Sequence, residues 1–423
     1  MDLPPLNLDP TECHRIQLEM KATIDAFMEH NPPKARESNA LSDGFKVYSH
    51  KRGAAKLYTR RAENSSLNEV LILDTTPMAL NDIADIYYSD SNDVFRVEMA
   101  ILYDDHFLDA AILHTSFAKS EFDAYQWFGV KYKKFNITGT TFADSRDAVY
   151  FEYMGMTYDK YGNRTLFLMR DSTYMASFPA QPRSVRNFIK AVYLFTELAS
   201  ENVVDTIQLA FSDPSGSIPS FIFNKQLVRY ASAASRMPYY LQQKRLVVAC
   251  LGTRPRRMTE GRICSSCNAK INGFKARYNC RACGDVVCGN CIVAIARPIA
   301  SKIPPAIVKD DYCKCCFVGV SSSSRGNSLS PRSTSAPMSK KFSFTDRATH
   351  PSEGNSASPT PSSSSSGSQG HNNPHFLQED INCLYIPDKR NDPFKQMQES
   401  LETQKILVSK MKERLNKPAY LTS

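Results

Sequence analysis

The sequence lacks any apolar stretch long enough to cross a membrane. Its run from Leu246 to Leu251 is six residues long, whereas a spanning helix needs about 20. The N-terminus, Met1-Asp-Leu-Pro-Pro, also lacks the basic and apolar regions of a signal peptide. We therefore expect a soluble, cytoplasmic chain, in a compartment whose reducing conditions keep cysteines as thiols.

Recognised catalytic motifs are missing as well. The chain has no nucleophile elbow, phosphate-binding loop, H-E-x-x-H motif or kinase signature, and its histidines are scattered without partner spacing. It has no C2H2 zinc-finger spacing, and its aromatic residues do not alternate with cations as in single-strand binders. These absences predict a protein that is not an enzyme and does not bind nucleic acid.

Core-forming residues are scarce between positions 319 and 375, where Ser, Pro, Gly and Asn dominate. Such a segment cannot bury enough apolar surface to offset its chain entropy, so we expect a disordered linker at 319–375. Beyond it, Asp392-Pro393 is typical of a helix start, and apolar residues at 3-4 spacing predict an amphipathic helix over 391–416. That helix could dock on the globular part of the chain or support weak self-association.

What the sequence does contain is eight cysteines arranged as four C-x2-C pairs. Two residues between paired thiolates let both sulfurs reach one metal at about 2.3 Å, and four pairs supply two tetrahedral zinc sites. Without metal this stretch has too little apolar mass for a core. The predicted Zn2+ ligands are Cys264, Cys267, Cys280, Cys283, Cys288, Cys291, Cys313 and Cys316.

The remaining four cysteines are expected to be free thiols. They are Cys13, Cys250, Cys315 and Cys383. Cys315 lies beside a predicted ligand but off register, and it is the one alternative to Cys316.

The spacing between the cysteine pairs, with gaps of 12, 4 and 21 residues, resembles that of the FYVE zinc finger. The run Cys280-Arg-Ala-Cys-Gly also resembles the family's C-R-x-C-G core. The resemblance covers residues 255–318 and implies cross-braced ligation, with the first and third pairs on one Zn2+ and the second and fourth on the other. A RING finger is the alternative, although it usually has a shorter gap before its third pair and a histidine among its ligands.

Membership of the FYVE family implies binding to phosphatidylinositol 3-phosphate on endosomal membranes. In the family's basic motif this chain keeps Arg277 and Arg281, the implied lipid-headgroup contacts, but lacks both histidines. Phe274 occupies the position of the membrane-inserting loop. Residues 251–316 carry twelve Lys and Arg against four Asp and Glu, nearly the whole net charge of +9, which favours an anionic membrane surface.

The first 250 residues are dominated by alternating, strand-like runs, which predict a sheet with one covered face. An amphipathic helix is predicted over Glu12–His30, with further helices at about Pro77–Tyr88 and Pro219–Arg236, the last broken by Pro238. The predicted strands are Gly44–Ser49, Lys56–Arg61, Glu69–Asp74, Phe107–Phe117, Trp127–Phe135, Ala148–Tyr158, Thr165–Asp171, Val185–Leu198 and Asn202–Ser212.

Three short motifs in this region resemble the START lipid-transfer family over residues 10–245. They are Ser145-Arg-Asp before a strand, Asp213-Pro-Ser-Gly-Ser-Ile-Pro before the last helix, and Asn224 within it. The resemblance implies a helix-grip fold, a curved antiparallel sheet around a C-terminal helix that encloses an apolar lipid tunnel. Alternatively, Phe, Tyr and Met side chains fill that space and leave a scaffold.

Together these features predict an α+β protein with a START-like domain, a FYVE-like double-zinc domain, a disordered linker and a terminal helix. The predicted function is a non-enzymatic lipid and membrane adaptor, peripheral on endosomal membranes, with two Zn2+ ions. A RING-like ubiquitin ligase or a protein-interaction scaffold without lipid specificity is the alternative. The sequence does not identify a lipid for the tunnel.

Overall fold

A computed structural model describes residues 3–322 of the chain, apart from short gaps. The gaps are residues 4, 50–54, 138–143, 176–177, 199–201, 232–235, 254–257, 273–275 and 300–304. Phe274, Cys383, the predicted linker from 323 onward and the predicted helix at 391–416 therefore lie outside the described residues, as does any self-association through that helix.

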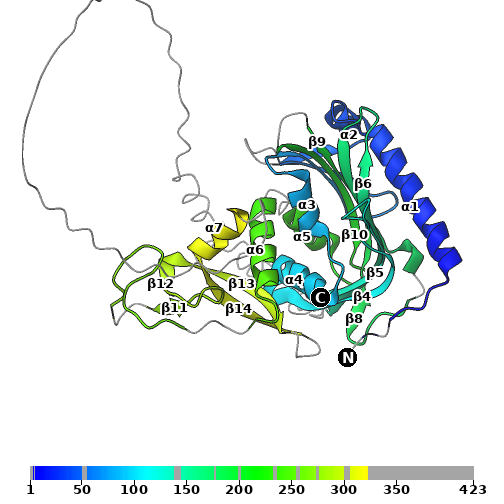
Figure 1. Ribbon diagram of the computed structural model, residues 1–423. Coiled ribbons are helices and arrows are strands. Elements are labelled where there is room, and N and C mark those ends of the chain that lie inside the picture. The colour runs from blue at the N-terminus through cyan, green and yellow to red at the C-terminus, as the bar shows by residue number, and fades with distance from the viewer. Residues whose placement is uncertain are drawn as a thin grey trace, which may run out of the picture. The chain divides into compact units, whose positions relative to one another are not determined.

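A single curved sheet organises the first 213 residues (Figure 1). Its order is β1-β2-β3-β10-β9-β7-β6-β5-β4; all these neighbours are antiparallel, and the short β8 adds a parallel pairing to β6. All nine predicted strands are present. The strands are β1 (Lys46–Ser49), β2 (Lys56–Arg61), β3 (Asn68–Thr76), β4 (Phe107–Phe117), β5 (Trp127–Phe135), β6 (Ser145–Tyr158), β7 (Arg164–Asp171), β8 (Ser184–Arg186), β9 (Phe188–Glu197) and β10 (Val204–Asp213).

Helices cover both faces of this sheet. None of the described helices is both long and apolar enough to cross a membrane. The helices of the first 250 residues are α1 (Pro10–His30), α2 (Arg36–Ser42), α3 (Leu80–Tyr87), α4 (Asn92–Tyr103), α5 (Ser220–Ala231) and α6 (Met237–Ala249).

The prediction of one covered face was wrong, because α1 covers the second face. Its apolar stripe, with Ile16, Met20 and Ile24, packs on sheet residues such as Val130 and Phe151. Asp9 caps the helix by accepting a hydrogen bond from the Thr11 N–H, and Pro10 opens the first turn. The opposite, concave face lies under α3, α4, α5 and α6 (Figure 1).

Three helices of this part of the chain, α2, α4 and α6, were absent from the prediction. Pro238 was expected to end a helix, but it lies in the first turn of α6, where its missing N–H costs nothing. The side chain of Ser91 caps α4 by accepting a hydrogen bond from Val94 N–H. Phe95, Val97 and Met99 are all buried, so α4 has apolar residues on more than one side.

The START-like motifs meet in space and have structural roles. Arg146, which is 2% exposed, donates hydrogen bonds to the carbonyls of Pro214 and Ser215, so the first motif holds the turn formed by the second. The Asp213 carboxylate accepts from Ser215 N–H at 2.7 Å, as expected of a turn residue. Asn224 on α5 accepts from Asn68 N–H at 2.9 Å and thereby fixes α5 to β3.

The cysteine-rich segment forms two small hairpins and a helix. These are β11 (Arg277–Asn279) with β12 (Val286–Cys288), β13 (Ile292–Ile299) with β14 (Ala306–Cys313), and α7 (Lys314–Ser322). The helix continues past the predicted domain boundary at 318.

This segment packs against α4 and α6. Val97 of α4 and Val247 of α6 share one apolar cluster with Ile295, Tyr312 and Phe317. Phe317 lies with its ring centroid 5.1 Å from that of Tyr239 on α6. Helices α4 and α6 therefore link the large sheet to the cysteine-rich segment.

Gly129 on β5 is a position that no larger residue can occupy without a backbone shift. A Cβ atom there would lie 2.1 Å from the carbonyl oxygen of His114 on β4. We expect Gly129→Ala to lower the free energy of unfolding in urea by about 2 kcal/mol or more. Gly261→Ala is the matched control, because a Cβ atom at that position would have no heavy atom within 4 Å, and equal stability of the two variants would contradict this account.

Candidate functional site

The eight predicted cysteine ligands gather into two groups of four. Cys264, Cys267, Cys288 and Cys291 form one group, and Cys280, Cys283, Cys313 and Cys316 form the other, with all sulfurs of a group within 4.8 Å of one another. This is the cross-braced pairing that the FYVE resemblance implied. Cys315 is exposed and belongs to neither group, so Cys316 is the ligand of the last pair.

Tight backbone turns hold one cysteine pair of each group. Asn268 lies four positions after Cys264, and Gly284 lies four positions after Cys280. Both adopt the left-handed conformation, with φ of 57° and 83°. Each turn closes with a backbone hydrogen bond, from Asn268 N–H to the Cys264 carbonyl and from Gly284 N–H to the Cys280 carbonyl. The Cys313 N–H points at the sulfur of Cys280 at 3.2 Å, which stabilises a thiolate.

The sulfur separations fit zinc. Two sulfurs at tetrahedral corners 2.3 Å from Zn2+ lie about 3.8 Å apart. The Cys267–Cys288 sulfurs are 3.8 Å apart and the Cys283–Cys313 sulfurs 3.9 Å apart. The two groups are therefore the binding sites of two Zn2+ ions, which have a structural role because each already has four protein ligands.

The two predicted headgroup arginines have different surroundings. Arg277 is exposed on β11. Arg281 is mostly buried, donates to the Thr253 carbonyl at 2.6 Å and lies 3.6 Å from the Asp310 carboxylate, which also pairs with Arg297. Arg281 thus has internal partners, and Arg277 is the arginine of the pair that faces solvent.

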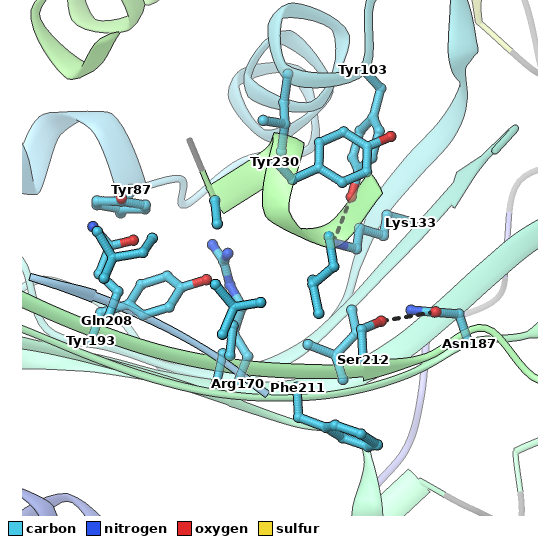
Figure 2. A pocket seen from close by; sticks show the side chains of 18 of the residues that line it. Tyr87, Tyr103, Lys133, Arg170, Asn187, Tyr193, Gln208, Phe211, Ser212 and Tyr230 are labelled. Carbon is cyan, nitrogen blue, oxygen red and sulfur yellow. Dashed lines mark hydrogen bonds between the residues drawn. The ribbon is translucent and has the colours of Figure 1, made fainter. Parts of the chain in front are cut away.

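A second candidate site is a cavity between the concave face of the sheet and the helices α3, α4, α5 and α6 (Figure 2). It contains about 1280 Å³ of space, including solvent-open space at its mouth. Most of the lining is apolar or aromatic, and Val70, Ile189, Phe223, Leu227 and Met237 are representative. A cavity therefore lies on the face of the sheet where the START resemblance implied a tunnel, and aromatic side chains do not fill it completely.

Charged side chains form a buried cluster beside this cavity. Glu152, fully buried on β6, pairs with Lys131 of β5 and accepts a hydrogen bond from Arg170 Nε of β7 at 2.7 Å. Burial favours the neutral acid, but Lys131 and Arg170 together hold the pKa of Glu152 below its usual value. On the helical side, Glu98 of α4 lies 3.3 Å from Lys244 of α6.

Lys133, two residues after Lys131 on β5, lines the cavity without a carboxylate partner among the described residues. Its ammonium donates to the Tyr103 hydroxyl at 2.9 Å, as Figure 2 shows. Burial, reinforced by the charge of Arg170, lowers the pKa of Lys133 to about 7. A buried lysine with a lowered pKa destabilises the fold, so Lys133 is a candidate functional residue of the cavity.

Sequence reasoning missed this charged cluster. Lys131 and Lys133 lie two residues apart between Trp127 and Phe135, so all four share one face of β5. Glu152 pairs in register with Arg170 on the neighbouring strands β6 and β7. The sequence signal for the cluster was therefore the presence of opposite charges at paired positions of neighbouring strands. Such a pattern is also typical of a sheet face that is exposed to solvent.

Comparisons with known proteins give one family match and several similar solved structures. Residues 256–322 match the family model of the FYVE zinc finger. No curated protein sequence matches the chain. Among solved structures, the chain is similar to human StAR-related lipid transfer protein 5, with 12% identity, a TM-score of 0.38, and coverage of 53% of this chain and 98% of that one.

Two further solved structures show comparable similarity. Human STARD10 has 14% identity and a TM-score of 0.35, over 49% of this chain and 78% of that one. A STAR-related lipid transfer protein fragment from Xanthomonas axonopodis has 18% identity and a TM-score of 0.35, over 47% of this chain and 99% of that one.

Removing one ligand should remove one metal ion. We expect Cys264→Ser to lower the zinc content from two ions per chain to about one, because three thiolates bind the ion less tightly than four. Native mass spectrometry would report the stoichiometry. Cys315→Ser is the matched control and should retain both ions; loss of zinc from that variant would mean that Cys315 is a ligand.

Lys133 should make stability depend on pH. Its folded pKa of about 7 lies below the unfolded value near 10.5, so the unfolded chain binds the extra proton between those values. The destabilisation is complete below pH 7 and disappears as the pH rises toward 10.5. Lys133→Met should therefore raise the free energy of unfolding at pH 6.5, by roughly 1–3 kcal/mol, and raise it less at pH 9.

The matched control is Lys134→Met, at the next position of β5. Lys134 donates to the Pro182 carbonyl at an exposed site, so its removal should change stability little at either pH. Urea unfolding of the three proteins at both pH values measures the effect. A Lys133→Met gain that is the same at pH 6.5 and pH 9 would show that this lysine is not neutralised by burial.

Proposed function

We propose that this protein is a non-enzymatic lipid-binding membrane adaptor. The observation that carries the proposal is the apolar cavity between the sheet and its covering helices. Burying one CH2 group of a ligand there is worth roughly 0.8 kcal/mol, so an acyl chain of ordinary length gains ample free energy. The polar groups beside the cavity would fix the ligand's orientation.

The zinc module supplies the membrane contact in this proposal. Residues 251–316 carry a large excess of Lys and Arg, and each cation near an acidic leaflet is worth roughly 1 kcal/mol. Arg277 is exposed and available to a phosphate, whereas Arg281 is held by Thr253 and Asp310. We propose binding to anionic membranes, including phosphatidylinositol 3-phosphate on endosomes, with Arg277 as the main headgroup contact.

Phe274 would insert into the bilayer beside this contact. Its position lies in the loop between the first two cysteine pairs, as the FYVE resemblance requires. Insertion of one aromatic side chain adds modest affinity, so charge and insertion together would hold the protein reversibly on the membrane.

Liposome sedimentation tests the membrane half of the proposal. Zinc-loaded protein should sediment with vesicles containing phosphatidylinositol 3-phosphate, and Arg277→Ala should weaken binding by about fivefold, or roughly 1 kcal/mol. Arg281→Ala, an equal loss of charge at a site with internal partners, is the comparison. Binding that is the same with and without the phosphoinositide would remove headgroup recognition from the proposal.

Native mass spectrometry of protein purified without added lipid tests the cavity half. A co-purifying apolar molecule, lost when the cavity is filled by Ala191→Trp, would support lipid binding. Protein that carries two zinc ions but never takes up a lipid would contradict it. Formation of ubiquitin chains by the zinc-loaded protein in a reconstituted assay would favour the ligase alternative instead.

A further inference from the structure

The buried charges around the cavity do not cancel. Lys131 pairs with Glu152, and Lys244 pairs with Glu98. Glu98 also accepts a hydrogen bond from Ser89 at 2.6 Å, so both carboxylates are already satisfied. Arg170 shares Glu152 with Lys131, lies 3.8 Å from Glu98 and also interacts with the hydroxyl of Tyr193.

The cations of this cluster, Lys131, Lys133, Arg170 and Lys244, therefore outnumber its carboxylates, Glu98 and Glu152, by four to two. Lys133 and Arg170 line the cavity, and their charged groups lie near one aromatic ring, because the Arg170 guanidinium carbon is 5.9 Å and the Lys133 ammonium 5.6 Å from the centroid of Tyr150. An excess of buried positive charge is costly, which makes an anionic partner at this point favourable.

Two donors at the cavity wall also lack acceptors within the described part of the chain. They are Nη2 of Arg170 and Nε2 of Gln208, whose residues are 8% and 4% exposed. Gln208 lies on β10, and Arg170 lies on β7 (Figure 2). Buried donors are almost always satisfied in native proteins, so these two point to an acceptor supplied by a ligand.

We infer that the cavity takes an amphiphile with an anionic head, a carboxylate or a phosphate, seated against Arg170, Lys133 and Gln208. The apolar tail lies along Val70, Ile189 and Leu227. This inference rests on the proposed lipid binding and specifies its ligand class. Arg170 lies between Lys133 and Gln208 (Figure 2), so a head that binds at Arg170 has a further donor on either side and lowers the excess of positive charge in the cluster.

Titration calorimetry of the full zinc-loaded chain at pH 7 tests the inference. The probes are oleate, oleoyl lysophosphatidate and the neutral oleyl alcohol, each below its aggregation concentration, together with inorganic phosphate alone. Both anionic amphiphiles should bind about tenfold or more tightly than the alcohol, because only they add hydrogen bonds from charged donors to the burial of the same apolar tail. Inorganic phosphate alone should bind weakly, since it buries no apolar surface.

Single substitutions at the cavity wall test where the anionic head of the ligand binds. Lys133→Met should weaken oleate binding by about tenfold and leave the affinity for oleyl alcohol unchanged. Lys134→Met, at the exposed neighbouring position, should retain wild-type affinity for both probes. Gln208→Leu removes a donor without a charge and should reduce the preference for oleate, which keeps the test decisive if Lys133→Met does not fold.

The outcomes separate the inference from the proposed function. Equal affinity for oleate and oleyl alcohol would overturn the anionic head and leave lipid binding intact. Failure of every amphiphile to bind would overturn both. Saturation by inorganic phosphate with no amphiphile bound would identify a free anion as the ligand and would likewise overturn the inference.

Discussion

The packing of α4 between the large sheet and the zinc module is the constraint on which the rest of the structure depends. One side of the helix contributes Phe95 and Met99 to the core under the sheet, and another places Val97 against the zinc module. The same helix carries Glu98 and Tyr103 into the cavity wall. Zinc–thiolate coordination connects the strands of the module and so maintains the apolar surface on which α4 packs. Metal binding and the cavity are thereby physically connected.

The cavity that we propose as a lipid site has a lining that is costly to the fold. An apolar interior would stabilise the sheet better than lysine, arginine and glutamate, whose burial removes them from water. The chain nevertheless keeps Lys133 where burial lowers its pKa to about 7 and keeps Arg170 with an unused donor. Such groups weaken the free protein and become favourable when a ligand satisfies them, which is the usual trade between stability and function.

In the zinc module, unlike at the cavity, several cations are paired with carboxylates of the chain. Part of its positive charge is neutralised within the structure, because Asp310 lies between Arg281 and Arg297. Lys309 likewise contacts Asp104 and Asp105 at the end of α4, at 3.0 and 3.1 Å. A net charge counted along the sequence therefore overstates what a membrane would meet, and exposed Arg277 matters more than the total suggests.

The sequence by itself determined the eight zinc ligands, because C-x2-C spacing fits a tetrahedral ion whatever surrounds it. It also determined the nine long strands, through period-two alternation. It did not reveal α4, since a helix buried on several sides has no single apolar stripe, or α6, whose Pro238 resembled a stop rather than a start. Only the tertiary structure decided that Lys133 and Arg170 line a cavity and that Lys131 and Glu152 are buried beside it. Alternation shows which residues share a face, but long-range packing decides whether that face meets water or the interior.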